Sequence, residues 1–238
     1  MPKFFMDKSA FGGSQAVLRG EDQAHLKVLR LRVSDIVTLC DGEGTDYEAR
    51  IVEMNKDGAV CEILSSGPCL AEPKTFVTLF QCMPKASKLD AVVQKATELG
   101  VGRVVPVISG RCVAAAPDKK LARYQKIALE AAKQCGRGRV PEVAAPVSFS
   151  AALEQMTQMD LAVMPYEQEP EGKIGNLPFS GAKTIGLMVG PEGGFEPEEA
   201  RAAQTAGVSL ITLGKRIMRT ETCPVAVLAL IMHLTGNL

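Results

Sequence analysis

The sequence lacks the cysteine spacing that marks a disulfide framework or a zinc site. Its seven cysteines are odd in number and scattered, and no two of them form a C-x-x-C pair. Scattered cysteines of this kind are typical of proteins that stay in a reducing compartment. We therefore expect no disulfide framework, no metal site and a cytoplasmic protein.

Long apolar runs are also missing. The longest, residues 223–234, falls well short of the roughly 18 apolar residues that indicate a membrane span. This run predicts a buried helix instead. Residues 1–7 lack the apolar stretch and the cleavage pattern of a secretory signal peptide. We expect neither export nor a membrane partner.

Two common nucleotide-binding loops are absent as well. The sequence contains no G-x-x-x-x-G-K-[ST] loop, and no G-x-G-x-x-G loop falls where a strand is expected to lead into a helix. ATP and NAD therefore lose their usual support in the sequence.

Net charge is zero, because 27 basic residues balance 27 acidic ones. Averaged over the whole chain, this is a poor indication of nucleic-acid binding. Basic residues nevertheless gather locally. Residues 25–32 carry three cations and no acid, and residues 119–139 carry seven cations and one acid. Either stripe, taken alone, is more often a solvated surface than a nucleic-acid site, so both interpretations stay open.

The pattern of the chain predicts two domains. Short β-rich runs alternate with glycine-containing turns between residues 35 and 64, which indicates a small antiparallel β-module. From residue 75 onward, strands alternate with helical stretches, which is typical of a mostly parallel α/β sheet with helices on both faces. We place the boundary near residue 72, with domains at 1–72 and 73–238.

Individual elements of the second domain can be placed from periodicity and punctuation. A helix over 89–99 is indicated by apolar residues at helical spacing, by a capping box at Ser87 and Asp90, and by Gly100 as its left-handed terminator. The remaining expected strands are 75–83, 104–108, 161–164, 184–189 and 210–213, and the remaining expected helices are 119–135, 151–159, 197–206 and 224–234.

Two polar, glycine-bearing loops follow strands of this predicted sheet. The first, GPEGGF at 190–195, lies where an open α/β sheet places a ligand, although a tight strand-to-helix turn explains it equally well. The second, LGKRIMRTET at 213–222, leads into the apolar helix and holds Arg219 and Glu221. Charges held there cost desolvation energy unless they are used in a site or paired with each other.

These loops belong to a longer set of motifs. The set also contains HLKVLR at 25–30, Pro84-Lys85, QKATELGV at 94–101 and Gln134-x-Gly136-Arg137. In order and spacing, the set resembles the bacterial RsmE family of 16S ribosomal RNA uridine-N3 methyltransferases, and the match spans nearly the whole chain. The sequence departs from that family at residues 86–88, where Ala, Ser and Lys replace Gly, Asp and Arg, and also at Lys3, Gly110 and Cys223.

The resemblance implies a SPOUT-type catalytic domain with a C-terminal trefoil knot, preceded by a PUA-like β-barrel that docks RNA. It also implies a homodimer that uses S-adenosylmethionine to methylate N3 of one uridine in 16S ribosomal RNA, with the assembled small subunit as the expected substrate. The positions that it assigns to the cofactor are Met164, Pro165, Val189, Gly190, Pro191, Glu192, Gly193, Gly194, Leu213, Gly214, Ile217, Met218, Arg219 and Thr222.

The chemistry of uracil suggests roles for two side chains. N3 carries a weakly acidic proton on the pairing edge, so the base must be unpaired and its anion stabilised. As hypotheses, Arg219 stabilises charge on a uracil carbonyl, and Glu221 orients Arg219 or receives the proton. Candidates for phosphate contacts, with surface solubility as the alternative, are Lys3, Arg30, Arg32 and Arg137.

Two other functions remain open at this point. A SPOUT enzyme that acts on another RNA, such as tRNA, would share the knot loops but differ in the N-terminal module. A non-catalytic RNA-binding factor would keep the basic stripes but would need neither glycine loop. Binding of the cofactor separates the second alternative from a methyltransferase.

Overall fold

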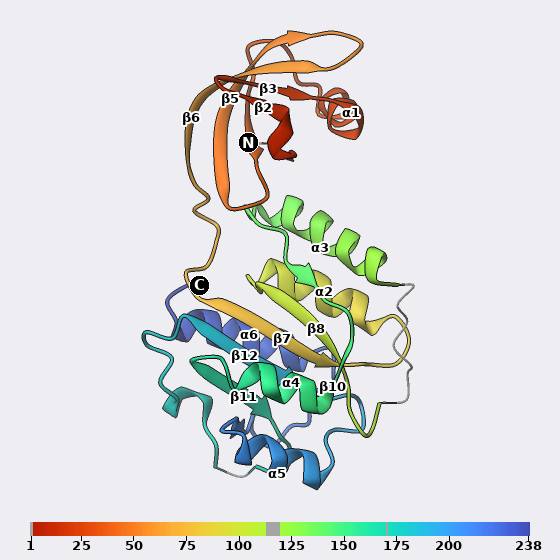
Figure 1. Cartoon of the computed structure of the whole chain (residues 1–238), viewed down its shortest axis with the longest axis vertical. Coiled ribbons are helices and arrows are strands. Elements are labelled where there is room, and N and C mark those ends of the chain that lie inside the picture. The colour runs from red at the N-terminus through yellow and green to blue at the C-terminus, as the bar shows by residue number, and fades with distance from the viewer. Residues whose placement is uncertain (1, 113–119, 170) are drawn as a thin grey trace. The chain divides into compact units, whose positions relative to one another are not determined.

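Figure 1 shows the computed structural model of the chain, which describes residues 2–112, 120–169 and 171–238. The chain forms two compact units: residues 1–72 with 132–140, and residues 73–131 with 141–238. All seven cysteines are free thiols. Within the described ranges, no helix is long and apolar enough to cross a membrane.

The first unit is built on a six-stranded sheet in the order β1-β4-β5-β6-β3-β2. Neighbouring strands are antiparallel, except that β1 and β4 run parallel. The expected β-module is therefore present, with further strands and a helix ahead of it. The elements are β1 (Lys3–Phe5), β2 (Phe11–Gly12), β3 (Gln15–Leu18), α1 (Gly20–Val28), β4 (Ile36–Cys40), β5 (Thr45–Met54) and β6 (Ala59–Pro68), with a 3-10 turn at Lys8–Ala10.

Turn chemistry and alternating side chains shape this sheet. Asn55 accepts hydrogen bonds from the backbone amides of Asp57 and Gly58, which closes the turn between β5 and β6 as the sequence indicates. Along β5, Ala49 and Ile51 are buried while their neighbours are not, so one face of the strand meets the core. The core of this unit is filled by residues such as Phe4, Leu18, Leu26 and Leu39.

The second unit holds a seven-stranded sheet in which every described pair is parallel. Its order is β10-β8-β7-β12-β11-β13, with β9 beside β8. The predicted mostly parallel α/β sheet is confirmed. The strands are β7 (Phe76–Cys82), β8 (Arg103–Ile108), β9 (Glu142–Val143), β10 (Val147–Ser148), β11 (Leu161–Pro165), β12 (Thr184–Val189) and β13 (Ser209–Ile211).

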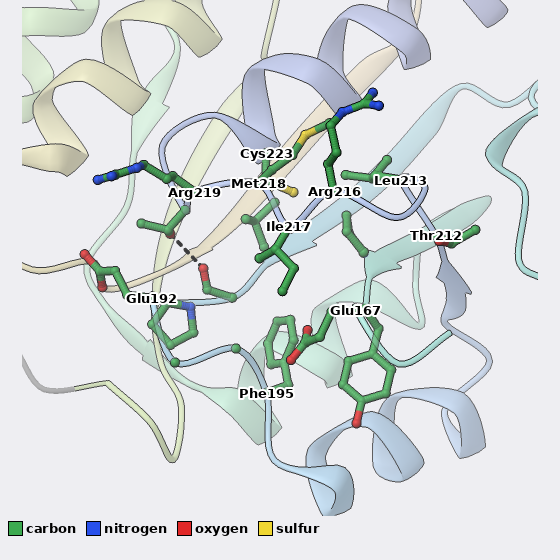
Figure 2. A pocket seen from close by; sticks show the side chains of 18 of the residues that line it. Glu167, Glu192, Phe195, Thr212, Leu213, Arg216, Ile217, Met218, Arg219 and Cys223 are labelled. Atoms are coloured by element: carbon green, nitrogen blue, oxygen red, sulfur yellow. Dashed lines mark hydrogen bonds between the residues drawn. The ribbon is translucent and has the colours of Figure 1, made fainter. Parts of the chain in front are cut away.

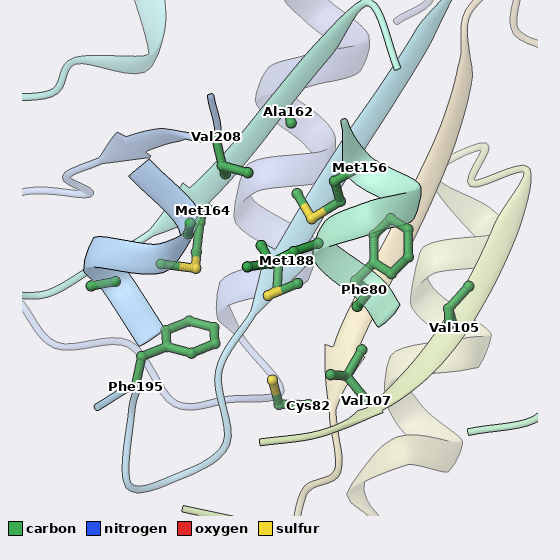
Figure 3. Close-up of a cluster of buried hydrophobic side chains, with 14 of the residues drawn as sticks. Phe80, Cys82, Val105, Val107, Met156, Ala162, Met164, Met188, Phe195 and Val208 are labelled. Atoms are coloured by element: carbon green, nitrogen blue, oxygen red, sulfur yellow. The ribbon is translucent and has the colours of Figure 1, made fainter. Parts of the chain in front are cut away.

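Helices cover both faces of this sheet (Figure 1). On one face, α4 and α5 pack over a core that includes Phe80, Met164 and Met188 (Figure 3). Side chains alternate along a strand, so Leu79 and Leu187 point to the other face, where α6 packs on β12 and α2 packs on α6. The helices are α2 (Lys88–Glu98), α3 (Leu121–Cys135), α4 (Phe149–Met156), α5 (Pro197–Thr205) and α6 (Cys223–Leu234).

The helix ends show which of the expected capping and terminating residues were right. Gly100 has a φ of +87° and terminates α2 as expected, and Pro224 lies in the first turn of α6. The capping box expected at Ser87 is wrong, because the Ser87 side chain makes no cap hydrogen bond. A capping box exists instead at the start of α5, between Glu196 and Glu199. Lys119, the expected start of the helix at 119–135, lies outside the described residues.

Candidate functional site

A cavity of about 590 Å³ opens at the carboxyl ends of β11, β12 and β13 (Figure 2). This is where an open parallel sheet places its ligands. Both glycine loops contribute to the cavity wall, so the two loops that the sequence singled out meet at one site. The walls are formed by Lys88, Pro165, Tyr166, Glu167, residues 189–195, residues 212–220 and Cys223.

The first loop, residues 190–194, is both a tight turn and a cavity wall. The amide of Gly194 donates to the carbonyl oxygen of Pro191 at 3.0 Å, which closes the turn. Gly194 has a φ of +67°, and a Cβ there would lie 2.6 Å from Oε1 of Glu167. Glycine thus provides both the backbone conformation and the space. The tight turn that the sequence indicates is therefore present, and the same residues line the cavity.

Arg111 fastens this loop from outside the cavity. Its guanidinium donates to the carbonyl oxygen of Gly193 at 2.8 Å and to the carboxylate of Glu196 at 2.9 Å. The amide of Gly110 donates to Glu199 at 2.8 Å, which ties the same segment to the first turn of α5. The loop between β12 and α5 is therefore held at its turn and at the helix that follows.

The second loop, residues 212–222, carries most of the exposed groups of the site. Gly214 has a φ of +86°, and the side chains of Arg216, Ile217 and Arg219 are exposed. Thr220 alone in this stretch of the loop is buried, and its hydroxyl donates to the carbonyl oxygen of Gly190 at 2.7 Å. This hydrogen bond joins the second loop to the first.

An ammonium group links three segments at the edge of the cavity. Nζ of Lys88, at the start of α2, lies 2.9 Å from Glu192 and 3.2 Å from Glu221. These two carboxylates raise the pKa of Lys88. Burial raises the pKa of Glu192, but Lys88 and backbone amides outweigh that effect and lower it overall. The pKa of Glu221 is lowered by its own backbone amide and by Lys88.

The pairing of Glu221 differs from the simplest expectation for two charges in one loop. Glu221 is paired with Lys88 rather than with Arg219, and Arg219 also lines the cavity. The sequence pattern gave no sign of this pairing, because Lys88 lies more than a hundred residues away along the chain. In the sequence, only the departure from the family motif at residues 86–88 drew attention to Lys88.

Most of the positions assigned to the cofactor line the cavity. They are Pro165, Val189, Gly190, Pro191, Glu192, Gly193, Gly194, Leu213, Gly214, Ile217, Met218 and Arg219. Two others do not line it. The Met164 side chain lies in the hydrophobic core, because alternation along β11 turns it toward α5 (Figure 3), and Thr222 lies at the N-cap of α6. Wall residues that the motifs did not indicate include Lys88, Tyr166, Glu167 and Thr212.

The four candidate phosphate contacts separate into two kinds. Arg30 and Arg32 are exposed, as a phosphate contact requires. The side chains of Lys3 and Arg137 are only 8% and 5% exposed, and both have acidic partners in the first unit, a placement that does not favour a phosphate contact. Nζ of Lys3 lies 2.7 Å from Asp46, and the Arg137 guanidinium lies 2.9 Å from Glu72. Their positive charges are therefore already paired within the first unit.

Family models match both parts of the chain. Residues 71–232 match an RNA methyltransferase domain, and residues 18–64 match an RNA methyltransferase PUA domain. The chain is 33% identical over 232 residues to ribosomal RNA small subunit methyltransferase E of Bacillus subtilis, which covers 92% of this chain and 90% of that protein.

Solved structures are similar over nearly the whole length. Ribosomal RNA small subunit methyltransferase E of Neisseria gonorrhoeae, bound to S-adenosylmethionine, superposes with a TM-score of 0.88 at 36% identity, covering 99% of this chain and 98% of that one. A putative methyltransferase from Legionella pneumophila with the same bound cofactor gives a TM-score of 0.84 at 26% identity, with 98% of each chain covered.

Proposed function

Because the chain belongs to the RNA methyltransferase family that includes ribosomal RNA small subunit methyltransferase E, we propose that it methylates N3 of a uridine in 16S ribosomal RNA. The methyl donor is S-adenosylmethionine, and the substrate is the small ribosomal subunit. The observation that carries this proposal is the cavity between the two glycine loops, with Arg219 on its wall. A ribosomal substrate also favours a cytoplasmic location.

The residues of the cavity fit this cofactor. Its volume of about 590 Å³ lies within the range of small-molecule sites, and Gly190, Gly193, Gly194 and Gly214 are among the residues that line it. Carboxylates at Glu167 and Glu192 and cations at Lys215 and Arg216 offer partners for a molecule that carries charges of both signs. When bound, S-adenosylmethionine supplies an electrophilic methyl group.

The chain's own residues must make the uracil nitrogen reactive. Loss of the N3 proton to solvent water leaves negative charge that is shared with the carbonyl oxygens of the base. Arg219, exposed at the cavity, is the cation available to stabilise that charge. Glu221 is held ionised by Lys88, so it contributes a fixed negative charge beside Arg219 rather than a strong base. Lys88 keeps that carboxylate in place.

Recognition of the RNA is proposed to begin at the first unit. Arg30 and Arg32 are exposed beside the apolar side chains of Val28, Leu29 and Val33, which are 77%, 41% and 51% exposed. Cations of this kind contact phosphates and provide affinity without reading sequence. Selection of one uridine then depends on the folded surface of the small subunit.

A homodimer is the proposed assembly. Helix α6 is apolar apart from His233 in its last turn, yet Leu230 is 39% exposed and Val225, Ala226 and Ala229 are only half-buried. A second copy would cover this face of the helix, as in the SPOUT enzymes that the chain resembles. The mass of the protein in solution, measured by sedimentation equilibrium, tests the proposal: a monomer contradicts it.

The experiment for the reaction uses small subunits that lack their methyl groups. The protein is incubated with them and with labelled S-adenosylmethionine, and the nucleosides of the RNA are then analysed. We expect 3-methyluridine. If the labelled methyl group appeared in added tRNA and not in the subunits, the protein would be a related enzyme that acts on another RNA. Absence of cofactor binding would favour a non-catalytic RNA-binding protein.

A further inference from the structure

A glutamine side chain lies inside the parallel sheet, next to the loops of the cavity. Gln81 is on β7, between β8 and β12, and is 0% exposed. In register, it is opposite Val189, the residue that precedes the loop at 190–194. A buried amide costs free energy unless its polar atoms are hydrogen-bonded, so its partners need an explanation.

The partners fix the orientation of the amide. Nε2 of Gln81 lies 3.0 Å from the carbonyl oxygen of Cys82, 3.4 Å from that of Val189 and 3.1 Å from the Thr220 hydroxyl. Carbonyl oxygens only accept hydrogen bonds, so the NH₂ group of the amide must face them. Within the described part of the chain, Oε1 of Gln81 is buried and has no hydrogen-bond partner.

Thr220 passes this interaction on to the cavity wall. Its hydroxyl proton goes to the carbonyl oxygen of Gly190 at 2.7 Å, so its oxygen accepts from Gln81. A directional chain of hydrogen bonds therefore runs from Gln81 through Thr220 to Gly190. It joins the end of β7, the loop at 190–194 and the loop at 212–222, and Thr220 and Gly190 line the cavity themselves.

We propose that Gln81 is a positioning residue for binding of S-adenosylmethionine, which rests on the proposed function. Through Thr220, it holds the two glycine loops at one spacing, so that backbone groups of both loops reach the cofactor together. An apolar side chain would fill the same place in the sheet without an unpaired Oε1, so packing alone does not account for a glutamine there. Gln81 itself does not line the cavity.

The test measures binding of S-adenosylmethionine by calorimetry to the full-length protein. Thr220→Val and Gln81→Met remove the donors at nearly constant volume, and Thr220→Ser keeps the hydroxyl. The control is Thr97→Val, because Thr97 is buried in the same unit and its hydroxyl donates to the carbonyl oxygen of Val93 in α2, away from the cavity. Thermal unfolding and circular dichroism check that each variant is folded.

We expect Thr220→Val and Gln81→Met each to weaken binding about tenfold, the effect of losing one buried hydrogen bond. Thr220→Ser should bind the cofactor more tightly than Thr220→Val. The double variant Gln81→Met/Thr220→Val should lose little more affinity than the single variant that binds more weakly, because both changes break the same chain of hydrogen bonds. Hydrogen exchange should also increase in the amides of both loops.

Several outcomes would overturn the inference. Unchanged affinity in Thr220→Val would do so, even if Gln81→Met fails to fold. An equal loss of affinity in Thr97→Val would show that general destabilisation, and not loop spacing, is responsible. Additive losses in the double variant would mean that the two residues act separately. Failure of the wild-type protein to bind the cofactor would instead reject the proposed function, and the inference with it.

Discussion

The ammonium group of Lys88 lies 3.2 Å from the carboxylate of Glu221. This pair joins the start of α2 to the loop that follows β13, and it leaves Arg219 at the cavity without that carboxylate as its partner. The division of labour in the site follows from this arrangement. Lys88 is paired with the negative charge of the loop, and the proposed function assigns Arg219 to a bound base.

Replacing Arg219 by alanine should abolish most of the turnover and leave the fold intact. Removal of one group that stabilises developing charge typically lowers kcat by about 10² to 10³. The measurement is methyl transfer to small subunits, with circular dichroism for the fold. Arg201→Ala is the matched control, because Arg201 is an exposed arginine on α5 that pairs with Glu198. Near-normal turnover of Arg219→Ala would end the assignment.

The pH dependence of methyl transfer should not report Glu221. Its own backbone amide and Lys88 lower the pKa of this carboxyl below its ordinary value of 4.5. Glu221 is therefore ionised above pH 4.5 and loses its charge only in more acidic solution. Between about pH 6 and 9, the rate should rise as uracil N3 loses its proton more easily. Glu221→Gln should lower the rate and keep the shape of this profile. A changed shape would make Glu221 the proton acceptor.

Gly194→Ala should weaken binding of S-adenosylmethionine, and Gly207→Ala should not. Both glycines have positive φ, +67° and +85°, so both substitutions introduce about 1 kcal/mol of backbone strain. Only the new Cβ at residue 194 enters the site, where it would lie 2.6 Å from Glu167, whereas Gly207 has open space. Titration calorimetry of the two variants separates loss of stability from loss of the site. Equal affinities would show that the cavity tolerates the methyl group.

Glu72→Gln should destabilise the protein by about 3 kcal/mol at pH 7, because it leaves the buried Arg137 guanidinium without its carboxylate. Burial raises the pKa of Glu72, but Arg137 and the amides of Gly138 and Arg139 outweigh it, so the pKa lies below 4.5. The stabilising effect is therefore complete above pH 4.5 and is lost as the pH falls through the lowered pKa.

Denaturant unfolding at neutral and acidic pH checks this expectation for Glu72. The difference between wild type and variant should shrink as the solution is acidified. Glu62→Gln is the control, since the pair between Arg50 and Glu62 is about half exposed and should contribute less than about 1 kcal/mol. A constant difference at all pH values would show that the charge of Glu72 is not what stabilises the unit.

Arg30→Ala and Arg32→Ala should each weaken binding to small ribosomal subunits and leave binding of the cofactor unchanged. Each lost phosphate contact should reduce the slope of log affinity against log salt by about 0.7 to 0.9. Filter binding over a range of salt concentrations measures the slope. Arg50→Ala removes an exposed arginine of the same unit that is already paired with Glu62, and should change the slope less. Equal slopes in all three variants would reject a specific contact.

Periodicity and turn residues predicted the sheet well, because the signals are local. The strand at 184–189 and the helix that begins near Pro197 occur at the expected places, since apolar runs, glycine and proline fix them within a few residues. The short strands β1, β9 and β10 were not predicted, whereas β13, which is as short as β1, overlaps the expected strand at 210–213.

The site was predicted where backbone defines it and missed where distant side chains complete it. The glycine loops could be found from their position after strands. Lys88 and Gln81 could not, because their roles depend on contacts with residues more than a hundred positions away. The acidic partners of Lys3 and Arg137 were missed for a related reason: a cation's sequence neighbours do not reveal a distant acid such as Asp46 or Glu72.

The division of the chain gives the first unit a discontinuous primary structure. Residues 132–140 return to it after residues 73–131 of the second unit, and Arg137 comes with them to pair with Glu72. Neither residues 1–72 nor residues 73–238 therefore correspond to one complete unit. A gene fragment that stops at residue 72 would encode an N-terminal unit whose last acid has lost its counter-ion, so this architecture resists recombination by simple exchange of an N-terminal segment.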